Sequence, residues 1–330
     1  MSSPRVVVFG STGVIGSLLV QVIAEKQPTW KIEAVSRSPG SSRFASLSNV
    51  KMVQGDAEDR DRTIEICSGA HTVYVAIGFP KYETKYWAEH WPIVMGNIIG
   101  ASSSTRLVFC DNLYAYGPGT NVSTSSTLVK PGLGSKPAIR ALIREKLQER
   151  MDIKPKSIVV VGGADFFGPN VTTLGVLGDT FFGHMAKKKS PYALGSADKV
   201  HDFCYVKDFA SALYLASVRL DSYGRFWICP HTIKNKTMKD IAKDAAALIE
   251  GSKAKVTVLP TWVISCLGLI DHIFADGFMH EMKEMMGWWV DDYTVDDSDF
   301  VKKFGVPATP YDEALADTVE FYQDREIAEK

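Results

Sequence analysis

Six short apolar runs, each rich in β-branched residues, recur along the first half of the chain and are separated by longer segments. The runs read RVVVF, KIEAVS, VKMVQ, TVYVAI, RLVFC and SIVVV. They are apolar almost throughout, which is typical of strands that helices cover on both faces. Strands that alternate with helices predict an α/β fold with a parallel, doubly wound sheet and right-handed crossovers.

The alternation loosens after residue 162, where a second region begins. HDFCYV and RFWICP are candidates for later strands, and 237–250 is expected to form a helix that starts at Thr237. A chain of 330 residues is long for one compact core but suits one large domain with a smaller appended lobe. We therefore predict a sheet domain from residues 1–162 plus 201–230, and a smaller C-terminal lobe from 163–200 plus 231–330.

Bulk composition argues against several classes of function. A net charge of −1 and a pI near 6.7 provide no basic surface for nucleic acid. No window approaches the about 18 apolar residues of a membrane helix, and the N-terminus lacks the features of a secretory signal. The five cysteines form no CxxC pair and the seven histidines form no HExxH motif, so neither disulfides nor a metal site is predicted. These observations favour a cytoplasmic protein that binds neither nucleic acid nor membrane.

A glycine motif lies between the first predicted strand and the first predicted helix. In VVVFGSTGVIGS the glycines follow a GxxGxxG spacing. This pattern suits a tight turn, a close approach of pyrophosphate to the backbone, and close packing of helix on sheet, while the helix N-terminus attracts phosphate. We predict that this turn binds a dinucleotide through Gly10, Ser11, Thr12, Gly13, Val14, Ile15 and Gly16. The sheet domain is then the dinucleotide-binding domain.

The end of the second predicted strand bears on the choice of cofactor. NAD-binding sites usually have a carboxylate there for the ribose 2′-hydroxyl, whereas this chain has Ser36, Arg37 and Ser38. A guanidinium flanked by hydroxyls suits a 2′-phosphate, so NADP(H) is favoured over NAD(H). The alternative is that Arg37 is only a solvated loop cation.

Two further strand ends are expected beside the cofactor. GDAED places Asp56 and Ala57 after the third strand, near the predicted adenine. Ala76, Ile77 and Gly78 end the fourth strand, where the backbone has to pass close to the cofactor.

The order of GSTGVIGS, VQGDAED, DNLYAYGP, ADFFGPN and HDFCYVKDFA resembles the extended short-chain dehydrogenase/reductase superfamily. More narrowly, it is similar to the atypical branch labelled NAD-dependent epimerase/dehydratase, and the likeness covers nearly the whole chain. The resemblance implies a Rossmann domain with a C-terminal substrate-binding lobe, a nicotinamide cofactor, and often a homodimer packed through helices of the sheet domain.

The catalytic motif of that superfamily is degenerate here. Family members usually carry a serine or threonine after the fifth strand and a YxxxK pair on the next helix. In this chain the hydroxyl position is Asn112, and SKPAIRALIREKLQE places Lys136 in the tyrosine slot and Arg140 in the lysine slot. The usual triad is therefore absent.

The substituted residues allow a different arrangement. Lys136 and Arg140 are four apart and share one helix face, and Arg140 is suited to hydrogen-bonding ribose hydroxyls but not to proton exchange. DNLYAYG supplies Tyr114 and Tyr116, either of which could act as an acid. Our hypothesis is an acid pair of Tyr114 and Lys136, with Asn112 orienting a carbonyl. The alternative is that the tyrosines only shape a pocket and the two cations form a solvated helix face.

Several segments bear on the substrate. FPKYETKYWAEHWP, ADFFGPN and HDFCYV supply aromatic side chains, including Tyr82, and favour a small apolar or aromatic substrate. Gly162 and Gly163 stand where sugar-nucleotide members commonly have an arginine, which argues against such a substrate. Segment 117–135 is long enough for a mobile lid, and Asp208 is expected to cap a helix.

These inferences predict an NADP(H)-dependent oxidoreductase that reduces a carbonyl or an activated double bond of a small, largely apolar molecule. One alternative is an isomerase or lyase without net redox chemistry on the same scaffold. The other is an NmrA-like regulatory protein that senses the cofactor without turnover, which the missing YxxxK pair favours. The substrate, the hydride face and the reaction direction stay open.

Overall fold

The computed structural model describes residues 3–38, 42–173, 175–266 and 278–329. The chain divides into two compact units. Unit 1 comprises Met1–Ala115, Leu128–Gly162 and Phe209–Trp227, and unit 2 comprises Tyr116–Thr127, Gly163–Asp208 and Ile228–Lys330. The predicted division returned 201–230 to the sheet domain, whereas residues 201–208 pack within unit 2. Among the described residues, no helix is long and apolar enough to cross a membrane.

Unit 1 is built on a seven-stranded sheet with the order β10-β6-β5-β4-β1-β2-β3. The strands are β1 (Arg5–Phe9), β2 (Lys31–Ser36), β3 (Val50–Gln54), β4 (Thr72–Val75), β5 (Arg106–Asn112), β6 (Ile158–Gly163) and β10 (Arg225–Ile228). Strand β1 pairs in parallel with β2 and β4, β2 with β3, and β4 with β5. The order of the first six strands is that of a Rossmann fold, so the predicted fold class is confirmed.

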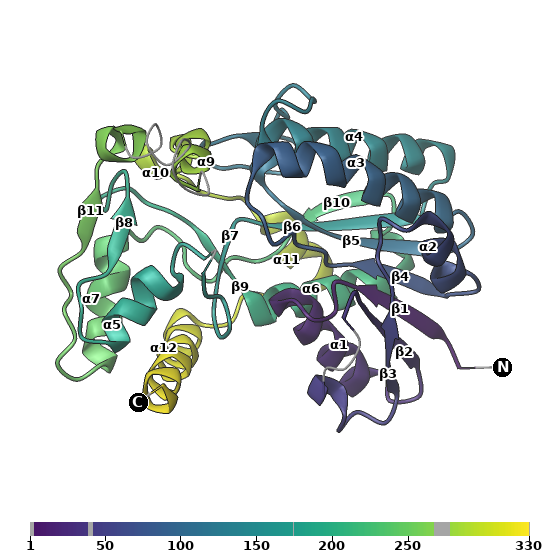
Figure 1. Cartoon of the computed structure of the whole chain (residues 1–330), viewed down its shortest axis with the longest axis horizontal. Coiled ribbons are helices and arrows are strands. Elements are labelled where there is room, and N and C mark those ends of the chain that lie inside the picture. Colours follow the sequence, from purple (N-terminus) through teal and green to yellow (C-terminus); the bar gives the residue numbers. More distant parts are fainter. Residues whose placement is uncertain (1–2, 39–41, 174, 267–277, 330) are drawn as a thin grey trace. The chain divides into compact units, whose positions relative to one another are not determined.

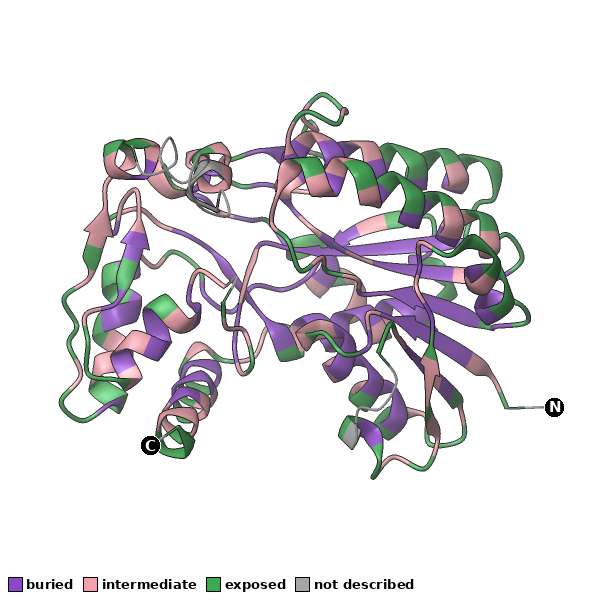
Figure 2. Ribbon diagram, viewed as in Figure 1, coloured by how far each residue is buried: buried purple, intermediate pink, exposed green. Residues whose placement is uncertain are grey.

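Helices cover both faces of this sheet (Figure 1). On one face α3 (Thr84–Ala101) and α4 (Lys136–Ile153) lie side by side, next to α2 (Arg60–Cys67). On the other face lie α1 (Val14–Lys26) and α6 (Val206–Val218). The central strands are buried because both faces are covered (Figure 2), which explains their nearly continuous apolar sequences.

Unit 2 contains two small parallel pairs of strands and several helices. Strand β7 (Asp165–Phe167) pairs with β9 (Phe203–Tyr205), and β8 (Tyr192–Leu194) pairs with β11 (Thr257–Leu259). The helices are the π-helix η3 (Gly178–Gly183), α5 (His184–Ala186), α7 (Met238–Leu248), α9 (Phe278–Glu284), α10 (Gly287–Val290), α11 (Ser298–Phe304) and α12 (Tyr311–Ala328). Helices α7 and α12 and the π-helix contribute side chains to one apolar core.

Local signals in unit 2 gave mixed results. The predicted helix start at Thr237 is confirmed, because the Thr237 hydroxyl accepts from the Asp240 amide and the Asp240 carboxylate accepts from the Thr237 amide. The predicted lid is not a free loop in its first half. The amide of Val122 donates to the carbonyl of Thr294 over 2.9 Å, and the amide of Thr294 donates to the carbonyl of Gly119 over 3.2 Å.

Candidate functional site

The turn between β1 and α1 requires glycine at two positions. Gly10 has φ of +75°, and a Cβ there would lie 2.3 Å from the carbonyl oxygen of Ala76. A Cβ on Gly16 would lie 2.1 Å from the carbonyl oxygen of Gly10. Real Cβ atoms do not approach backbone that closely, so both positions exclude every side chain. The mechanical roles assigned to these glycines match the local geometry.

Helix α1 begins at this turn without a side-chain cap. Its N-cap is Gly13, which makes no capping side-chain hydrogen bond, and both Thr12 and Gly13 are exposed. Ser11 instead faces inward, and its hydroxyl donates to the carbonyl of Val35 over 2.9 Å. An uncapped and exposed helix start presents amides and a positive dipole end, which suit an anionic group. The turn therefore fits the pyrophosphate of a dinucleotide.

The ends of β2 and β4 lie next to the turn because both strands pair in parallel with β1, and the end of β3 lies beside that of β2. At the end of β2, Ser36 is half-buried and Arg37 is exposed, and the Arg37 carbonyl accepts from Nε2 of Gln54. Asp56 is half-buried, and its Oδ1 accepts from the amide of Glu58. Of the remaining predicted residues, Ala57 and Ala76 are buried, Ile77 is half-buried and Gly78 is exposed.

A second arginine beside the glycine turn was missed by sequence reasoning. Nη1 of Arg43 donates to the carbonyl of Thr12 over 3.0 Å. Arg43 lies in the short 3-10 helix η1 (Ser42–Phe44), six residues after Arg37 in the chain. The sequence signal that could have found Arg43 is its position shortly after Arg37, which was already predicted to bind the cofactor.

Behind the end of β5 lies a buried charge cluster. The Asp111 carboxylate lies 3.3 Å from Nη2 of Arg140 and 3.5 Å from Nη1 of Arg144. All three side chains are buried, and the Arg144 guanidinium lies 4.0 Å from the ring centre of Phe226. Arg140 therefore faces the sheet, and the solvated-face alternative is wrong for it.

Arg140 also holds Asn112 in place. Its Nε donates to Oδ1 of Asn112 over 3.2 Å, and the same oxygen accepts from the amide of Tyr114 over 3.2 Å. The guanidinium lies 4.8 Å from the ring centre of Trp91. Because Oδ1 already accepts two hydrogen bonds, the amide nitrogen Nδ2 is the group that Asn112 offers to a ligand.

Lys136 is fully buried as well, so it belongs to no solvated face. It is the first residue of α4, whose N-cap Ser135 accepts from the amide of Ala138. Its Nζ donates to Oγ1 of Thr84 over 3.2 Å and lies 4.7 Å from the ring centre of Tyr82. The hydroxyl of Tyr82 in turn donates to the hydroxyl of Tyr114 over 3.1 Å. The structure thus places Tyr82 beside both members of the predicted acid pair.

The remaining predicted residues have different surroundings. Tyr116 is buried, ends the 3-10 turn η2 (Tyr114–Tyr116) and belongs to unit 2. The aromatic residues expected to line a substrate cleft are partly core residues. In unit 1 these are Trp87 and Trp91, and in unit 2 they are Phe167, Phe203 and Tyr205. Phe79, Tyr82 and Tyr86 are half-buried and remain candidates.

Two polar groups of unit 2 make partly buried hydrogen bonds, and one of them, Asp208, differs from expectation. Asp208 does not cap α6 but lies in its first turn, where its carboxylate accepts from the amide and hydroxyl of Thr309 and the hydroxyl of Thr232. His201 lies between Asp165 and Trp288: Nε2 is 2.7 Å from the Asp165 carboxylate and Nδ1 is 3.2 Å from the Trp288 carbonyl. Within the described part of the chain, no cluster of side chains could hold a metal ion.

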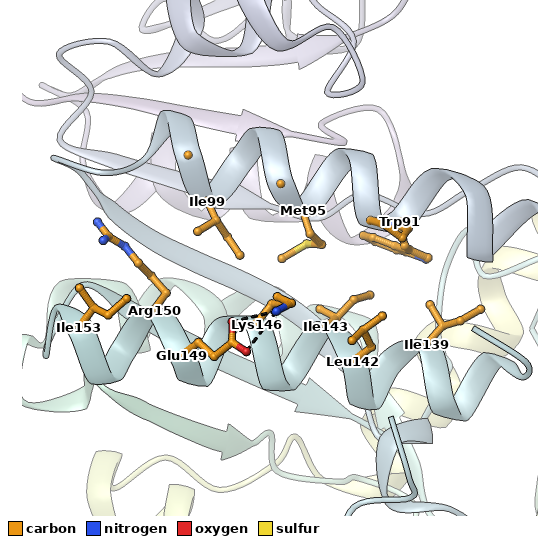
Figure 3. A pocket seen from close by; sticks show the side chains of 13 residues that line it. Trp91, Met95, Ile99, Ile139, Leu142, Ile143, Lys146, Glu149, Arg150 and Ile153 are labelled. Carbon is orange, nitrogen blue, oxygen red and sulfur yellow. Dashed lines mark hydrogen bonds and ion pairs between the residues drawn. The ribbon is translucent and has the colours of Figure 1, made fainter. Parts of the chain in front are cut away.

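A groove of about 520 Å³ separates the outer surfaces of α3 and α4 (Figure 3). Its apolar lining includes Met95 and Ile99 from α3 and Leu142 and Ile143 from α4. Charged side chains of α4, namely Lys146, Glu149 and Arg150, border it. None of the predicted cofactor-binding or catalytic residues lines this groove.

Known families and structures agree on the fold. The family model described as NAD dependent epimerase/dehydratase family matches residues 6–229. The UDP-glucuronic acid 4-epimerase of Bacillus cereus in complex with NAD is 14% identical, with a TM-score of 0.76 over 97% of this chain and 99% of that chain. The dTDP-glucose 4,6-dehydratase of Bacillus anthracis in complex with NAD is 14% identical, with a TM-score of 0.77 over 98% of each chain.

A further solved structure, the UDP-glucose 4-epimerase of Thermotoga maritima with UDP-glucose, is 17% identical. Its TM-score is 0.77 over 98% of this chain and 99% of that chain. At these identities the likeness establishes the fold. No curated protein matches the sequence significantly.

Proposed function

Because the chain belongs to the NAD dependent epimerase/dehydratase family, we propose that it is a nicotinamide-dependent enzyme. In this proposal it reduces a carbonyl or an activated double bond of a small, largely apolar molecule. The observation that carries the proposal is the turn at Gly10 and Gly16, where no Cβ fits and where α1 begins uncapped. The bound cofactor would supply the hydride, and the chain's own side chains would hold the substrate and supply a proton.

Our proposal for the cofactor is NADP(H). It is supported by the lack of a carboxylate at the end of β2, by the exposed Arg37, and by Arg43 beside the glycine turn. The solved structures of similar fold hold NAD, which is a property of those proteins. Because Nη1 of Arg140 is buried, the contribution of Arg140 to the nicotinamide site is proposed to pass through Asn112, which its Nε holds in place.

Protonation of the substrate is assigned to Tyr114. Its hydroxyl accepts a hydrogen bond from the hydroxyl of Tyr82, and Lys136 contacts the ring of the same Tyr82. Nδ2 of Asn112 would donate to the substrate oxygen, because Arg140 and the Tyr114 amide occupy Oδ1. Arg140 then acts in part by keeping Asn112 oriented.

The apolar substrate class is supported by Gly162 in β6, a position where sugar-nucleotide enzymes of the family that the chain resembles commonly carry an arginine. A Cβ on Gly162 would lie 2.8 Å from Cδ2 of Leu113, so this position cannot take the arginine expected of a sugar-nucleotide enzyme without repacking. Phe79 and Tyr82 offer half-buried aromatic surface after β4. These features favour a substrate without phosphate groups.

A second candidate is an isomerase or lyase that uses the cofactor without net consumption. The names of the solved epimerases and the dehydratase with the same fold favour this candidate. It would use the same Tyr114 and Asn112 for proton exchange and substrate orientation.

The test combines binding and turnover. Calorimetry with oxidised and reduced NADP and NAD is expected to show binding, and NADPH absorbance is expected to fall with a member of a panel of enones, aldehydes and ketones. Tyr114→Phe should lower kcat by about 10²- to 10⁴-fold, while Tyr192→Phe in unit 2 serves as the matched control. Absence of heat with every nicotinamide form would contradict the proposal. Binding without consumption of NADPH would favour the second candidate or a cofactor sensor.

We also propose that α3 and α4 pair with the same helices of a second copy. Ile93 and Ile153 leave large apolar side chains exposed, and a Cβ on Gly96 or Gly100 would meet only open space. Gly96 lies inside α3, where glycine costs helix stability, so its smooth surface is better explained by another helix packing against it.

The charges of α4 are self-complementary for such a pairing. If two α4 helices run antiparallel with Lys146 opposite Glu149 of the second copy, then Glu145 lies opposite Arg150 and Leu142 opposite Ile153. Each charged residue then faces a residue of opposite charge, and the two apolar residues face each other. A contact between two identical surfaces requires such self-complementarity. The apolar groove between α3 and α4 would be filled by this contact (Figure 3).

A further inference from the structure

The segment that follows β4 and the first residue of α3 bring two hydroxyl side chains to the predicted acid pair. Tyr82 donates to the hydroxyl of Tyr114 over 3.1 Å, and Thr84 accepts from Nζ of Lys136 over 3.2 Å. The same Nζ lies 4.7 Å from the centre of the Tyr82 ring. Tyr82 is thus in contact with the phenol of one member and the ammonium of the other.

We propose that Tyr82 is a positioning residue that transmits the effect of Lys136 to Tyr114. This inference rests on the proposed function, in which Tyr114 protonates the substrate. In the family that the chain resembles, a lysine assists the tyrosine; here Tyr82 contacts both groups and takes part in that assistance.

The chemistry follows from what each group is able to donate. When Tyr114 gives its proton to the reduced substrate, its O–H bond breaks, an O–H or C–H bond forms on the substrate, and a phenolate remains. The Tyr82 hydroxyl stays protonated and donates to that phenolate, and a hydrogen bond to the charged form stabilises it. Water returns the proton to Tyr114 after product release. A bound reduced nicotinamide would supply the hydride with its electron pair and would be oxidised in doing so.

Lys136 strengthens this hydrogen bond without giving up a proton. An ammonium near the face of a phenol ring is attracted to the ring and withdraws electron density from it. The Tyr82 hydroxyl therefore becomes a better donor to Tyr114. Because Lys136 is fully buried, solvent screens this effect little.

The fold holds Tyr82 in this geometry. Nε1 of Trp87 donates to the carbonyl of Lys81 over 3.1 Å, which ties the segment to the first turn of α3. The Tyr82 and Trp87 rings pack edge to face with centres 5.5 Å apart. Trp87 belongs to the buried core of unit 1, so the position of Tyr82 is set by packing.

The first readout needs no substrate. In protein labelled with ¹³C at the tyrosine Cζ atoms, NMR titration follows the ionisation of Tyr114, assigned by its loss in Tyr114→Phe. In Tyr82→Phe, Tyr114 is expected to ionise at a pH higher by about one unit, since a hydrogen bond to a charged group contributes roughly tenfold or more. Tyr86→Phe, in the first turn of α3, is the matched control and should leave this titration unchanged.

The second readout is the pH profile of turnover. Tyr82→Phe should lower kcat about tenfold with little change in KM, and should move the limb due to Tyr114 to higher pH. Tyr82→Met keeps an apolar side chain but also removes the ring that faces Lys136, so it should exceed the effect of Tyr82→Phe. The methionine side chain differs in volume from phenylalanine. Tyr82→Met is therefore the second variant to measure if Tyr82→Phe does not fold.

The outcomes separate the two proposals. A shifted Tyr114 titration in a protein that turns over no substrate supports the role of Tyr82 and contradicts the proposed function. Turnover with an unshifted titration in both Tyr82 variants overturns the role of Tyr82 and leaves the proposed function intact. A fall in kcat with neither the titration nor the pH limb displaced also overturns it, because a merely structural contact would produce that result.

Discussion

Nε of Arg140 donates a hydrogen bond to Oδ1 of Asn112 over 3.2 Å. The residue in the usual lysine position thus reaches the residue in the usual hydroxyl position, across 28 residues of sequence. Arg140 also faces the buried carboxylate of Asp111 at 3.3 Å. This relationship makes the end of β5 and the first turns of α4 one polar unit.

We predict that Arg140→Met destabilises the protein by about 3 kcal/mol, because it leaves the buried Asp111 with one cation fewer. This loss of stability should stay near the low end of the range for breaking a buried ion pair, since Arg144 still lies 3.5 Å from Asp111. Urea unfolding measures it. Gln148→Met, on the exposed side of the same helix, is the control and should change little. Equal unfolding midpoints for the two variants would contradict the structural role of Arg140.

Gly16→Ala is expected to abolish nucleotide binding, because its Cβ would lie 2.1 Å from the carbonyl oxygen of Gly10 and would force the turn open. Calorimetry with NADP and NAD measures the loss. The control is Gly96→Ala, a helical glycine with open space at its Cβ, which should bind both nucleotides normally. Normal binding by Gly16→Ala would refute the assignment of the turn.

Arg37→Ala and Arg43→Ala separate the two nicotinamide cofactors. If the guanidiniums contact a 2′-phosphate, each variant should weaken NADP binding at least about tenfold and leave NAD binding nearly unchanged. Arg60→Ala, an exposed arginine at the start of α2, provides the comparison. An equal loss for both cofactors would show that these arginines serve the turn and not the 2′-phosphate.

Asp297 provides a pH-dependent prediction in unit 2. Burial raises the pKa of its carboxyl, but hydrogen bonds from His231 and Lys234 outweigh burial and hold the pKa below its usual value. A depressed pKa means that the carboxylate stabilises the fold above its unfolded pKa of about 3.9, and that this contribution is lost as pH falls through the lower folded value.

Asp297→Asn should therefore be less stable than the unchanged protein at pH 7, and the gap should shrink as the pH falls below about 4. Urea unfolding at several pH values measures the gap. Asp324→Asn, on the exposed side of α12, should show no such dependence. A gap that stays constant down to strongly acidic pH would contradict the ionic role of Asp297.

The α4 pairing can be tested by charge reversal. In a homodimer of either variant, Lys146→Glu or Glu149→Lys, like charges lie opposite one another. Each variant measured separately should therefore dissociate more readily than the unchanged protein. Mixed together, the two variants bring opposite charges face to face and should form a heterodimer. Size-exclusion chromatography with light scattering measures both results. Ile64→Glu, an exposed apolar residue on α2, is the control that should leave the oligomeric state unchanged. Monomers under all conditions would remove the proposed interface.

The parts of the fold that the sequence alone determined depend on neighbours along the chain. Apolar runs in β1 to β6 marked the strands, because strands buried on both faces have no polar side to alternate with. The glycine turn followed from steric limits on a Cβ, and the start of α7 followed from a hydroxyl within reach of nearby amides.

The tertiary structure decided what spacing could not. A separation of four placed Lys136 and Arg140 on one helix face, but whether that face met water or protein depended on distant groups, such as Thr84, 52 residues away. Tyr82 and Tyr114 meet across 32 residues, so no local pattern predicted their hydrogen bond. Asp208 likewise binds Thr309 and does not cap its helix. Long polar side chains find their partners only after the backbone has brought remote segments together, and that is why the site needed the folded chain.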